Sequence, residues 1–176
     1  NILKKNLSGW SEYKHYSCKV FTPNNLIELQ NFLINNNKKI IARGHGCSNG
    51  DQSVLMDGIV VDMNNLNKII SYDYKKKKIE VEAGAKLTDI LLTVLKDNLF
   101  LPSTPGGLDI TVAGAVSNNI HGKDCFKNGY FENNVNKIKI LSGKGEVVEI
   151  SRSKNEELFR SIFSSQGLLG IIYSVE

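Results

Sequence analysis

The stretch ARGHGCSNGD, residues 42–51, gathers three glycines, an arginine, a histidine and a cysteine directly after the apolar run KKIIA. Glycine tolerates a positive φ, so successive backbone amides of such a loop can turn toward one bound anion. Arg43 and Ser48 would add a charge and a hydroxyl donor to this anion site. The loop taken alone is equally compatible with a plain tight turn.

Two common phosphate-binding motifs do not match this loop. Gly44, Gly46 and Gly50 are spaced G-x-G-x-x-x-G, one residue longer than the Rossmann fingerprint, which must also open a helix. The following residues, DQSVLMDGIVVDM, contain an Asp57-Gly58 turn and β-branched residues, which are typical of a turn and a strand. A P-loop requires GK[ST], which does not follow.

A second segment, TPGGLDITVAGAVSNNIHGKD, interleaves small residues with hydrogen-bond donors. The small residues are Gly106, Gly107, Ala113, Gly114 and Ala115, and the donors are Thr104, Thr111, Ser117 and Asn118. Such a composition lets a flat, polar ring lie against the backbone, whereas a packed core would use larger side chains. Two amide-rich segments far apart in sequence suit a long ligand that carries a diphosphate and a heterocycle.

Alternating and amphipathic patterns predict the elements that hold these segments. Strands are expected at 18–23, 38–42, 57–63, 69–74, 78–83, 135–142, 145–150 and 170–176, and helices at 24–37, 86–98 and 155–163. The helix at 86–98 should bury Leu87, Ile90, Leu91 and Val94. The order predicts an α+β fold of two lobes, about 1–85 and about 86–176, with the glycine-rich segments between them.

Composition excludes several classes of protein. The net charge of +4 is too small for the basic surface of a nucleic-acid binder, and the run Lys75–Lys78 between two expected strands favours a solvated hairpin turn over a phosphate site. Three widely spaced cysteines show no metal-ligand spacing and indicate reduced thiols in a cytoplasmic protein. No apolar run of about 18 residues is present, so any membrane association is expected only through other parts of the protein.

The motifs RGHGCSNGD, PGGLDITVAGAVSNNIHGKD and SSQGLLGIIYSVE, taken together and in this order, resemble the FAD-binding (PCMH-type) domain of the vanillyl-alcohol-oxidase flavoproteins. Within that family, LSGWSEY and NNIHGKD are most similar to the branch of decaprenylphosphoryl-ribose 2-oxidases and aldonolactone oxidases. The resemblance covers essentially the whole chain. It implies two α+β lobes with FAD between them, and a further substrate domain that is not expected within these 176 residues.

The resemblance also implies which residues contact FAD. The loop from Arg43 to Asp51 would hold the diphosphate and ribityl chain, the second segment the diphosphate and isoalloxazine, and the C-terminal motif the adenine or ribose end. The cofactor-binding residues expected on this basis are Arg43, Gly44, His45, Gly46, Cys47, Ser48, Asn49, Gly50, Gly106, Thr111, Val112, Ala113, Gly114, Ser117, Asn118, His121, Gly170, Ile171 and Ile172. A Cβ at Gly46 is expected to block the diphosphate.

Many relatives attach FAD covalently through a histidine directly before the loop serine. Cys47 stands at that position here and His45 lies two residues earlier, so non-covalent FAD is favoured. The resemblance places His121 beside the flavin as a candidate catalytic residue, with a structural histidine as the alternative. Lys123 is the second candidate, for an anionic substrate or the reduced flavin, with a solvated lysine as its alternative.

The function implied is the FAD domain of an oxidoreductase that oxidises the CH–OH group of a sugar, sugar alcohol, lactone or lipid-linked sugar by hydride transfer to flavin. The chain alone is expected to be inactive, with a sugar-like substrate bound through the further domain and no metal. Two alternatives stay open: a non-catalytic nucleotide-binding or regulatory module, and the FAD domain of a UDP-sugar reductase type of enzyme.

Overall fold

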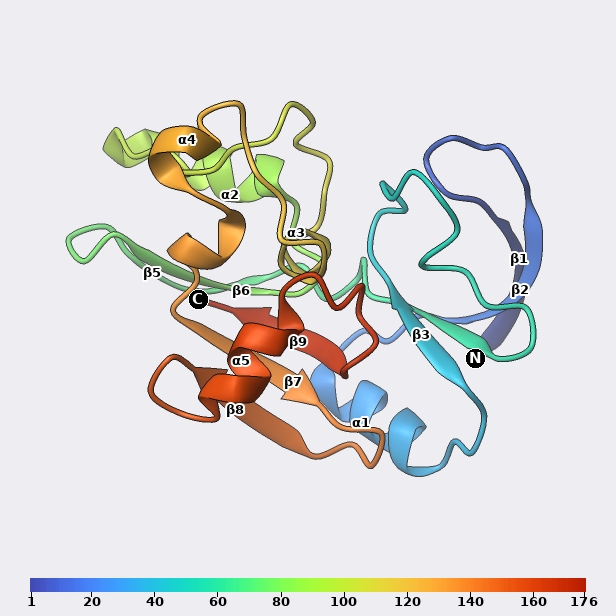
Figure 1. Ribbon diagram of the computed structural model, residues 1–176. Helices are drawn as coiled ribbons and strands as arrows, with labels where there is room; N and C mark the ends of the chain where they lie inside the picture. Colours follow the sequence, from blue (N-terminus) through green and yellow to red (C-terminus); the bar gives the residue numbers. More distant parts are fainter.

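A computed structural model describes residues 1–176 and contains two β-sheets, which lie side by side in Figure 1. Sheet A has the order β1 (Ile2–Leu7), β2 (Tyr16–Phe21), β4 (Ile59–Asp62), β3 (Ile40–Arg43). Sheet B has the order β5 (Ile69–Asp73), β6 (Lys78–Glu82), β9 (Ile171–Val175), β7 (Lys137–Leu141), β8 (Val147–Ser151). Helices accompany both sheets, so the α+β class predicted from the sequence is confirmed.

In sheet A, β3 and β2 both run parallel to β4, and α1 (Leu26–Ile34) connects β2 to β3. The Asn25 side chain caps α1 by accepting from the Glu28 N–H at 2.9 Å. Its buried face, Leu29 and Leu33, belongs to the large core around sheet B, and Gln30 donates to the Gly145 carbonyl at 3.0 Å. The helix therefore joins the two halves of the molecule.

Sheet B is antiparallel, and its β5–β6 hairpin turns at Tyr74–Lys77, as the lysine run predicted. The sheets divide between Asp62 and Ile69, not near residue 85 as the sequence suggested. The reason is that β6 pairs with β9, more than 80 residues later, and this pairing draws the whole β5–β6 hairpin into the second sheet. Such a long-range pairing leaves no local sequence signal.

Several short elements were not predicted, although α2 (Leu87–Val94) buries the four expected residues and α5 (Glu156–Ile162) lies where expected. The unpredicted elements are β1, α3 (Val112–Ser117), α4 (Cys125–Asn128) and the 3-10 turn η2 (Phe131–Asn134). The helix expected at 86–98 ends at Val94 and continues as the 3-10 turn η1 (Leu95–Asp97). The strand β1 is almost entirely exposed, and α3 contains a glycine and β-branched residues that disfavour helix. None of the helices is both long and apolar enough to span a bilayer.

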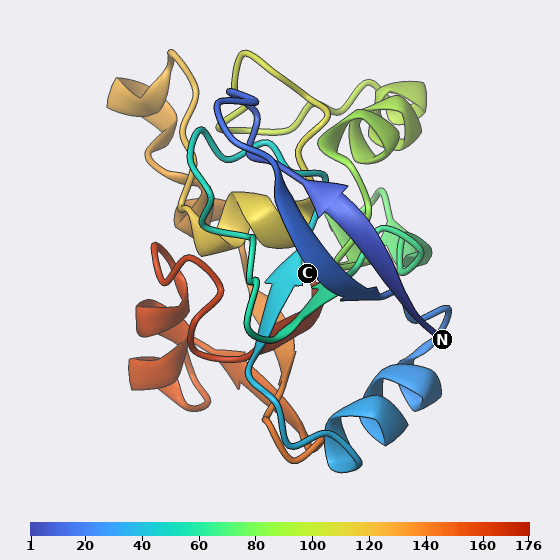
Figure 2. The same cartoon turned by 90° about the vertical axis from the view of Figure 1, so that its right-hand side faces the viewer.

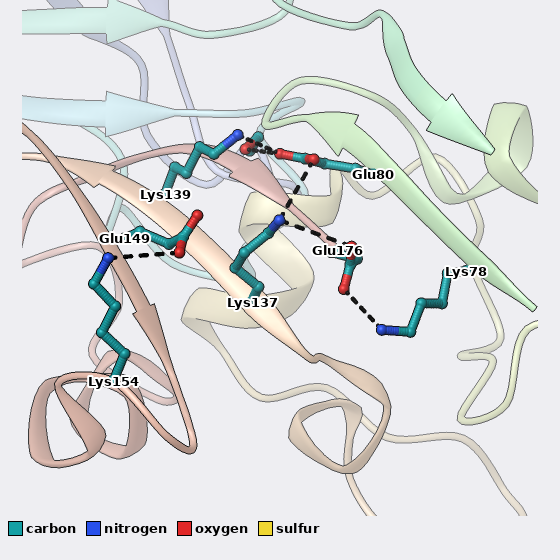
Figure 3. Close-up of polar contacts among 8 residues, drawn as sticks. Lys78, Glu80, Lys137, Lys139, Glu149, Lys154 and Glu176 are labelled. Carbon is teal, nitrogen blue, oxygen red and sulfur yellow. Dashed lines mark hydrogen bonds and ion pairs between the residues drawn. The ribbon is translucent and has the colours of Figure 1, made fainter. Parts of the chain in front are cut away.

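Alternating charges link the strands of sheet B, as Figure 3 shows. The Glu80 carboxylate accepts from Lys139 Nζ at 2.8 Å and from Ser174 Oγ at 2.9 Å, and Lys137 lies 3.8 Å from its second oxygen. Lys137 also approaches Glu176, which pairs with Lys78 at 3.3 Å. Glu80 is only 8% exposed, so these partners stabilise a carboxylate that has lost most of its contact with water.

Candidate functional site

A cavity of about 300 Å³ lies between the two lobes. Its wall comes from the loop after β3, from α3 and its flanking residues, and from the turn before β9. Figure 2 shows the loop after β3 in front of α3. The cavity therefore brings together the three segments whose motifs the sequence singled out.

The N-terminal segment holds the loop after β3 from outside. The Trp10 N–H donates to the Ser48 carbonyl at 2.8 Å, and Ser11 Oγ donates to the Asn49 carbonyl at 2.7 Å. The Tyr16 hydroxyl donates to Asp51 at 2.8 Å. These contacts fix the loop carbonyls on the side of the N-terminal segment. No composition or spacing within residues 8–16 predicts this role.

The backbone donors of the same loop behave differently from its acceptors. From Gly44 to Ser53, no backbone N–H donates to an acceptor within the protein. Polar backbone groups of folded proteins bond within the chain or to water, so these ten donors, which have no partner in the chain, remain open to water or to a ligand. Because this loop lines the cavity, its amides are available to bind an anion there.

Arg43 lies directly beneath the loop. Its guanidinium donates to Ser53 Oγ at 3.0 Å and to the Ser8 carbonyl at 2.8 Å, and it forms no ion pair with a carboxylate. Burial lowers the pKa of this guanidinium, while the charge of Asp62 opposes the shift. An arginine remains protonated despite such a shift, so the loop sits over a half-buried positive charge.

Gly46 has a φ of +75°, which favours glycine. A Cβ at this position would collide with Nη2 of Arg43. The sequence had suggested that such a Cβ would block the diphosphate directly. The structure corrects this expectation, because the Cβ would point toward the arginine below the loop.

The helix α3 forms the second wall, and its N-terminus is satisfied within the protein. Val112 N–H donates to the Ala85 carbonyl, Ala113 N–H to the Ala83 carbonyl, and Gly114 N–H to the Thr111 hydroxyl. The helix therefore has no free first-turn amides for an anion. Backbone N–H groups without a partner in the protein are found instead in the loop after β3.

Close approach of the two walls requires Gly44. A Cβ on Gly44 would collide with the Thr111 hydroxyl, so only glycine lets the loop pack against the start of α3. Further along the loop, Cys47 Sγ lies 3.5 Å from the Asp109 carbonyl. The first and second glycine-rich segments are thus in direct contact.

The third wall is the turn before β9. Gly167 and Gly170 have φ values of +78° and +142°, and the Gln166 N–H donates to the Ser117 carbonyl at 2.9 Å. Gly170 and Ile172 line the cavity, while Ile171 alternates to the other side of the strand and is 5% exposed.

The structure places 14 of the 19 expected cofactor residues in the cavity wall, which concentrates the expected contacts at one place. Those outside it are Gly50, Gly106, Val112, His121 and Ile171. Eight wall residues were not expected: Ala42, Gln52, Ser53, Met63, Ile110, Ile120, Gln166 and Gly167. Gln166 and Gly167 lie within the quoted SSQGLLG motif, so sequence reasoning could have included them.

Val112 lies on the opposite side of α3 from Ala113 and Gly114, because successive helical residues are about 100° apart. It is 3% exposed and belongs to the large core. The expected contact of Val112 with the cofactor is therefore replaced by a packing role.

The two candidate catalytic residues follow the wall residue Ile120 in the sequence, but neither of them lines the cavity. His121 is exposed, its Nδ1 is 3.2 Å from the Gly122 carbonyl, and its ring meets Tyr130 edge-on at 5.4 Å between centroids. Lys123 is also exposed and forms no ion pair. Their side chains are thus free to contact a molecule that approaches from outside the domain.

Lys86 was not expected near the site. Its Nζ lies 3.4 Å from His45 Nε2 and 3.4 Å from Asp109 Oδ1, so it bridges the two glycine-rich segments. Burial, followed by the charge of Asp109, raises the pKa of the neighbouring Cys47 thiol, although Lys86 and Arg43 oppose this. A raised pKa keeps the thiol protonated and unreactive at neutral pH.

A sequence profile described as FAD binding domain matches residues 19–151, about three quarters of the chain. The matched part includes the loop after β3 and the whole of α3.

Individual relatives agree with this match. Decaprenylphosphoryl-beta-D-ribose oxidase of Mycolicibacterium smegmatis is 37% identical over 134 residues, 76% of this chain and 29% of the relative. Cytokinin dehydrogenase 1 of Arabidopsis thaliana is 38% identical over 138 residues, which cover 77% of this chain and 24% of the relative. L-gulonolactone oxidase of Mus musculus is 30% identical over 168 residues, which cover 92% of this chain and 38% of the relative. The chain therefore spans between about a quarter and two fifths of the length of these relatives.

Proposed function

The chain belongs to the FAD binding domain family of PCMH-type flavoproteins, and from this premise we propose that it is the cofactor-binding part of an enzyme that oxidises a CH–OH carbon of a sugar-derived substrate. Its cofactor is FAD, and the relatives matched are oxidases and dehydrogenases. The substrate class is our proposal.

The row of amides from Gly44 to Ser53 above the Arg43 guanidinium supports the cofactor-binding part of this proposal. A diphosphate needs several donors at once, and hydrogen bonds to its charged oxygens are stronger than those between neutral groups. The positive charge of Arg43 close by stabilises the anion further. The site also lacks a competing carboxylate on Arg43. The residues present therefore fit the anionic centre of FAD.

The wall formed by Ala113, Gly114 and Ser117 fits the planar part of the cofactor. Small side chains let a ring approach the backbone of α3, and Asn118 keeps its amide nitrogen on the Gly114 carbonyl at 2.9 Å. When bound, FAD supplies an acceptor for two electrons and a hydride. The protein's own contribution is to orient the ring and to exclude water on the α3 side.

The choice of a sugar-derived substrate rests on the resemblance of NNIHGKD and on two of the relatives, whose names specify a ribose derivative and a gulonolactone. Cytokinin dehydrogenase 1 names a different substrate at a similar identity, so similarity over this domain does not by itself identify the substrate. We infer that His121 and Lys123, which are exposed and follow the wall residue Ile120 in the chain, meet the substrate.

We expect the purified chain to bind FAD in preference to FMN and NAD, and to release it on acid precipitation. FMN lacks the adenosine half of FAD and NAD lacks the isoalloxazine, so each would lose the contacts of one part of the cavity. Release follows from the protonated Cys47 at the position where covalent relatives carry histidine. Titration calorimetry measures the affinity for each of the three cofactors, and the visible spectrum of the acid supernatant measures the released flavin. Absence of FAD binding by folded protein would refute the proposed site, and a flavin–peptide adduct at His45 would refute non-covalent attachment.

We also expect the FAD-loaded chain to remain oxidised when mixed anaerobically with aldonolactones and polyols. Hydride transfer requires a substrate held close to the ring, and such positioning can contribute about 7–11 kcal/mol to lowering the barrier. The candidate groups His121 and Lys123 lie outside the cavity wall, so we do not expect these two side chains alone to hold a substrate against the ring. Stopped-flow absorbance of the flavin measures reduction. Rapid bleaching by any of these compounds would contradict this expectation.

A further inference from the structure

A second cavity, of about 280 Å³, lies between sheet B and α2, on the other side of α3 from the cofactor cavity. The two cavities share no lining residue. Thirteen of the 19 residues around the second cavity are hydrophobic, so its interior is far more apolar than the cofactor cavity. An apolar cavity of about 150 Å³ is enough to hold benzene in another protein, and this one can take a larger apolar group.

The floor of this cavity is part of the folded core. Val81 and Val175 come from adjacent strands of sheet B, and Leu87, Ile90 and Val94 come from the buried stripe of α2. All five are less than 10% exposed. In Figure 1, α2 lies above the β5–β6 hairpin, with the end of β9 beside the hairpin. The tail of a ligand would therefore rest on rigid elements.

Charge gathers at one edge of the opening. Lys77 and Lys78, from the lysine-rich turn between β5 and β6, both line the cavity. Lys78 is neutralised by Glu176 at 3.3 Å, whereas Lys77 is exposed and forms no ion pair. An apolar interior with an unpaired ammonium at its edge is complementary to a molecule with an apolar chain and one anionic end.

Apolar surface at the same opening is left in water. Phe100, which also lines the cavity, is 63% exposed. A bound chain would cover this ring, and burial of the apolar surface favours binding.

We propose that this second cavity binds a single-chain amphiphile with an anionic head, of the fatty-acid carboxylate class. The chain lies between sheet B and α2, and the carboxylate lies beside Lys77. This site is separate from the FAD site and does not depend on the function proposed for it.

The test is a calorimetric titration with dodecanoate below its micellar concentration, repeated with decanoate and with dodecanol. Dodecanoate should bind with one-to-one stoichiometry. Each methylene removed should weaken binding about fourfold, since burying one is worth about 0.8 kcal/mol, so decanoate should bind about 15-fold more weakly. Lys77→Glu should lower the affinity for dodecanoate about fivefold and leave the affinity for dodecanol unchanged.

Matched variants separate the site from general effects. Lys144→Glu makes the same charge change in the exposed β7–β8 turn and should bind dodecanoate like wild type. Leu101→Trp fills the cavity and should abolish binding, whereas Leu92→Trp, on the exposed side of α2, should not. FAD titrations of every variant establish that each is folded.

Several results would overturn the proposal. These are no saturable dodecanoate binding, equal affinity in Lys77→Glu, retained binding in a folded Leu101→Trp, or competition between dodecanoate and FAD. Binding to phosphatidylglycerol vesicles without binding of dodecanoate monomers would also overturn it, because that result indicates contact with a membrane surface.

Discussion

Gly46→Val should weaken FAD binding by at least about 100-fold, or about 2.7 kcal/mol, and still leave a folded protein. The new side chain would meet Nη2 of Arg43, which is held by Ser8 and Ser53, and valine disfavours the φ of +75°. Relieving the collision must move either the guanidinium or the loop amides. Each hydrogen bond lost to a charged diphosphate oxygen costs about 1.5–3 kcal/mol, so losing one or two suffices.

Gly143→Val is the matched control for this loop variant. Gly143 lies in the exposed β7–β8 turn, its φ is not positive, and no atom lies within 4 Å of a Cβ built on it. Calorimetric FAD titration and thermal unfolding of both variants separate binding from stability. A folded Gly46→Val protein with unchanged affinity would show that the loop amides do not hold the diphosphate.

Replacing Glu80 with glutamine should lower the free energy of unfolding at pH 7 by about 2 kcal/mol, because the Lys139 ammonium loses its carboxylate partner. The effect is smaller than for a fully buried pair, since the Lys139 side chain is 30% exposed. Glu149→Gln is the control. Its partner Lys154 lies 3.6 Å away with 61% of its side chain exposed, so the expected loss is below about 0.5 kcal/mol. Figure 3 shows both pairs.

The effect of Glu80→Gln should depend on pH. Burial raises the pKa of the Glu80 carboxyl, but hydrogen bonds from Lys139 and Ser174 and the charges of Lys139 and Lys137 outweigh it and hold the pKa below its ordinary value. A group with a lowered folded pKa stabilises fully above its unfolded pKa and loses that contribution as the pH falls through the folded pKa. Urea unfolding between pH 7 and about pH 3 should therefore show the difference from wild type shrinking with acid. A difference that grows with acid would contradict this assignment.

The sequence by itself determined which kinds of residue make up the candidate site and in which order they follow along the chain. The glycines of residues 42–51, the small residues of the second segment and their order along the chain predicted an anion-binding loop opposite a wall suited to a planar ring. It also determined α2, whose buried stripe follows from the 3.6-residue period, and the β5–β6 turn at the lysine run. These features depend on backbone freedom and local periodicity, which neighbouring residues specify.

Only the tertiary structure decided which of these residues meet and which way they point. A Cβ on Gly46 would point toward Arg43, and the Val112 side chain packs in the core. Lys86 lies close to His45, although 41 residues separate them in the sequence. The contacts that hold the loop are also tertiary, because the Trp10 N–H and the Ser11 hydroxyl bond the Ser48 and Asn49 carbonyls across 38 residues of chain. Hydrogen bonds between distant segments and the pairing of β6 with β9 depend on the whole fold, since their energies are gained only after long loops have closed.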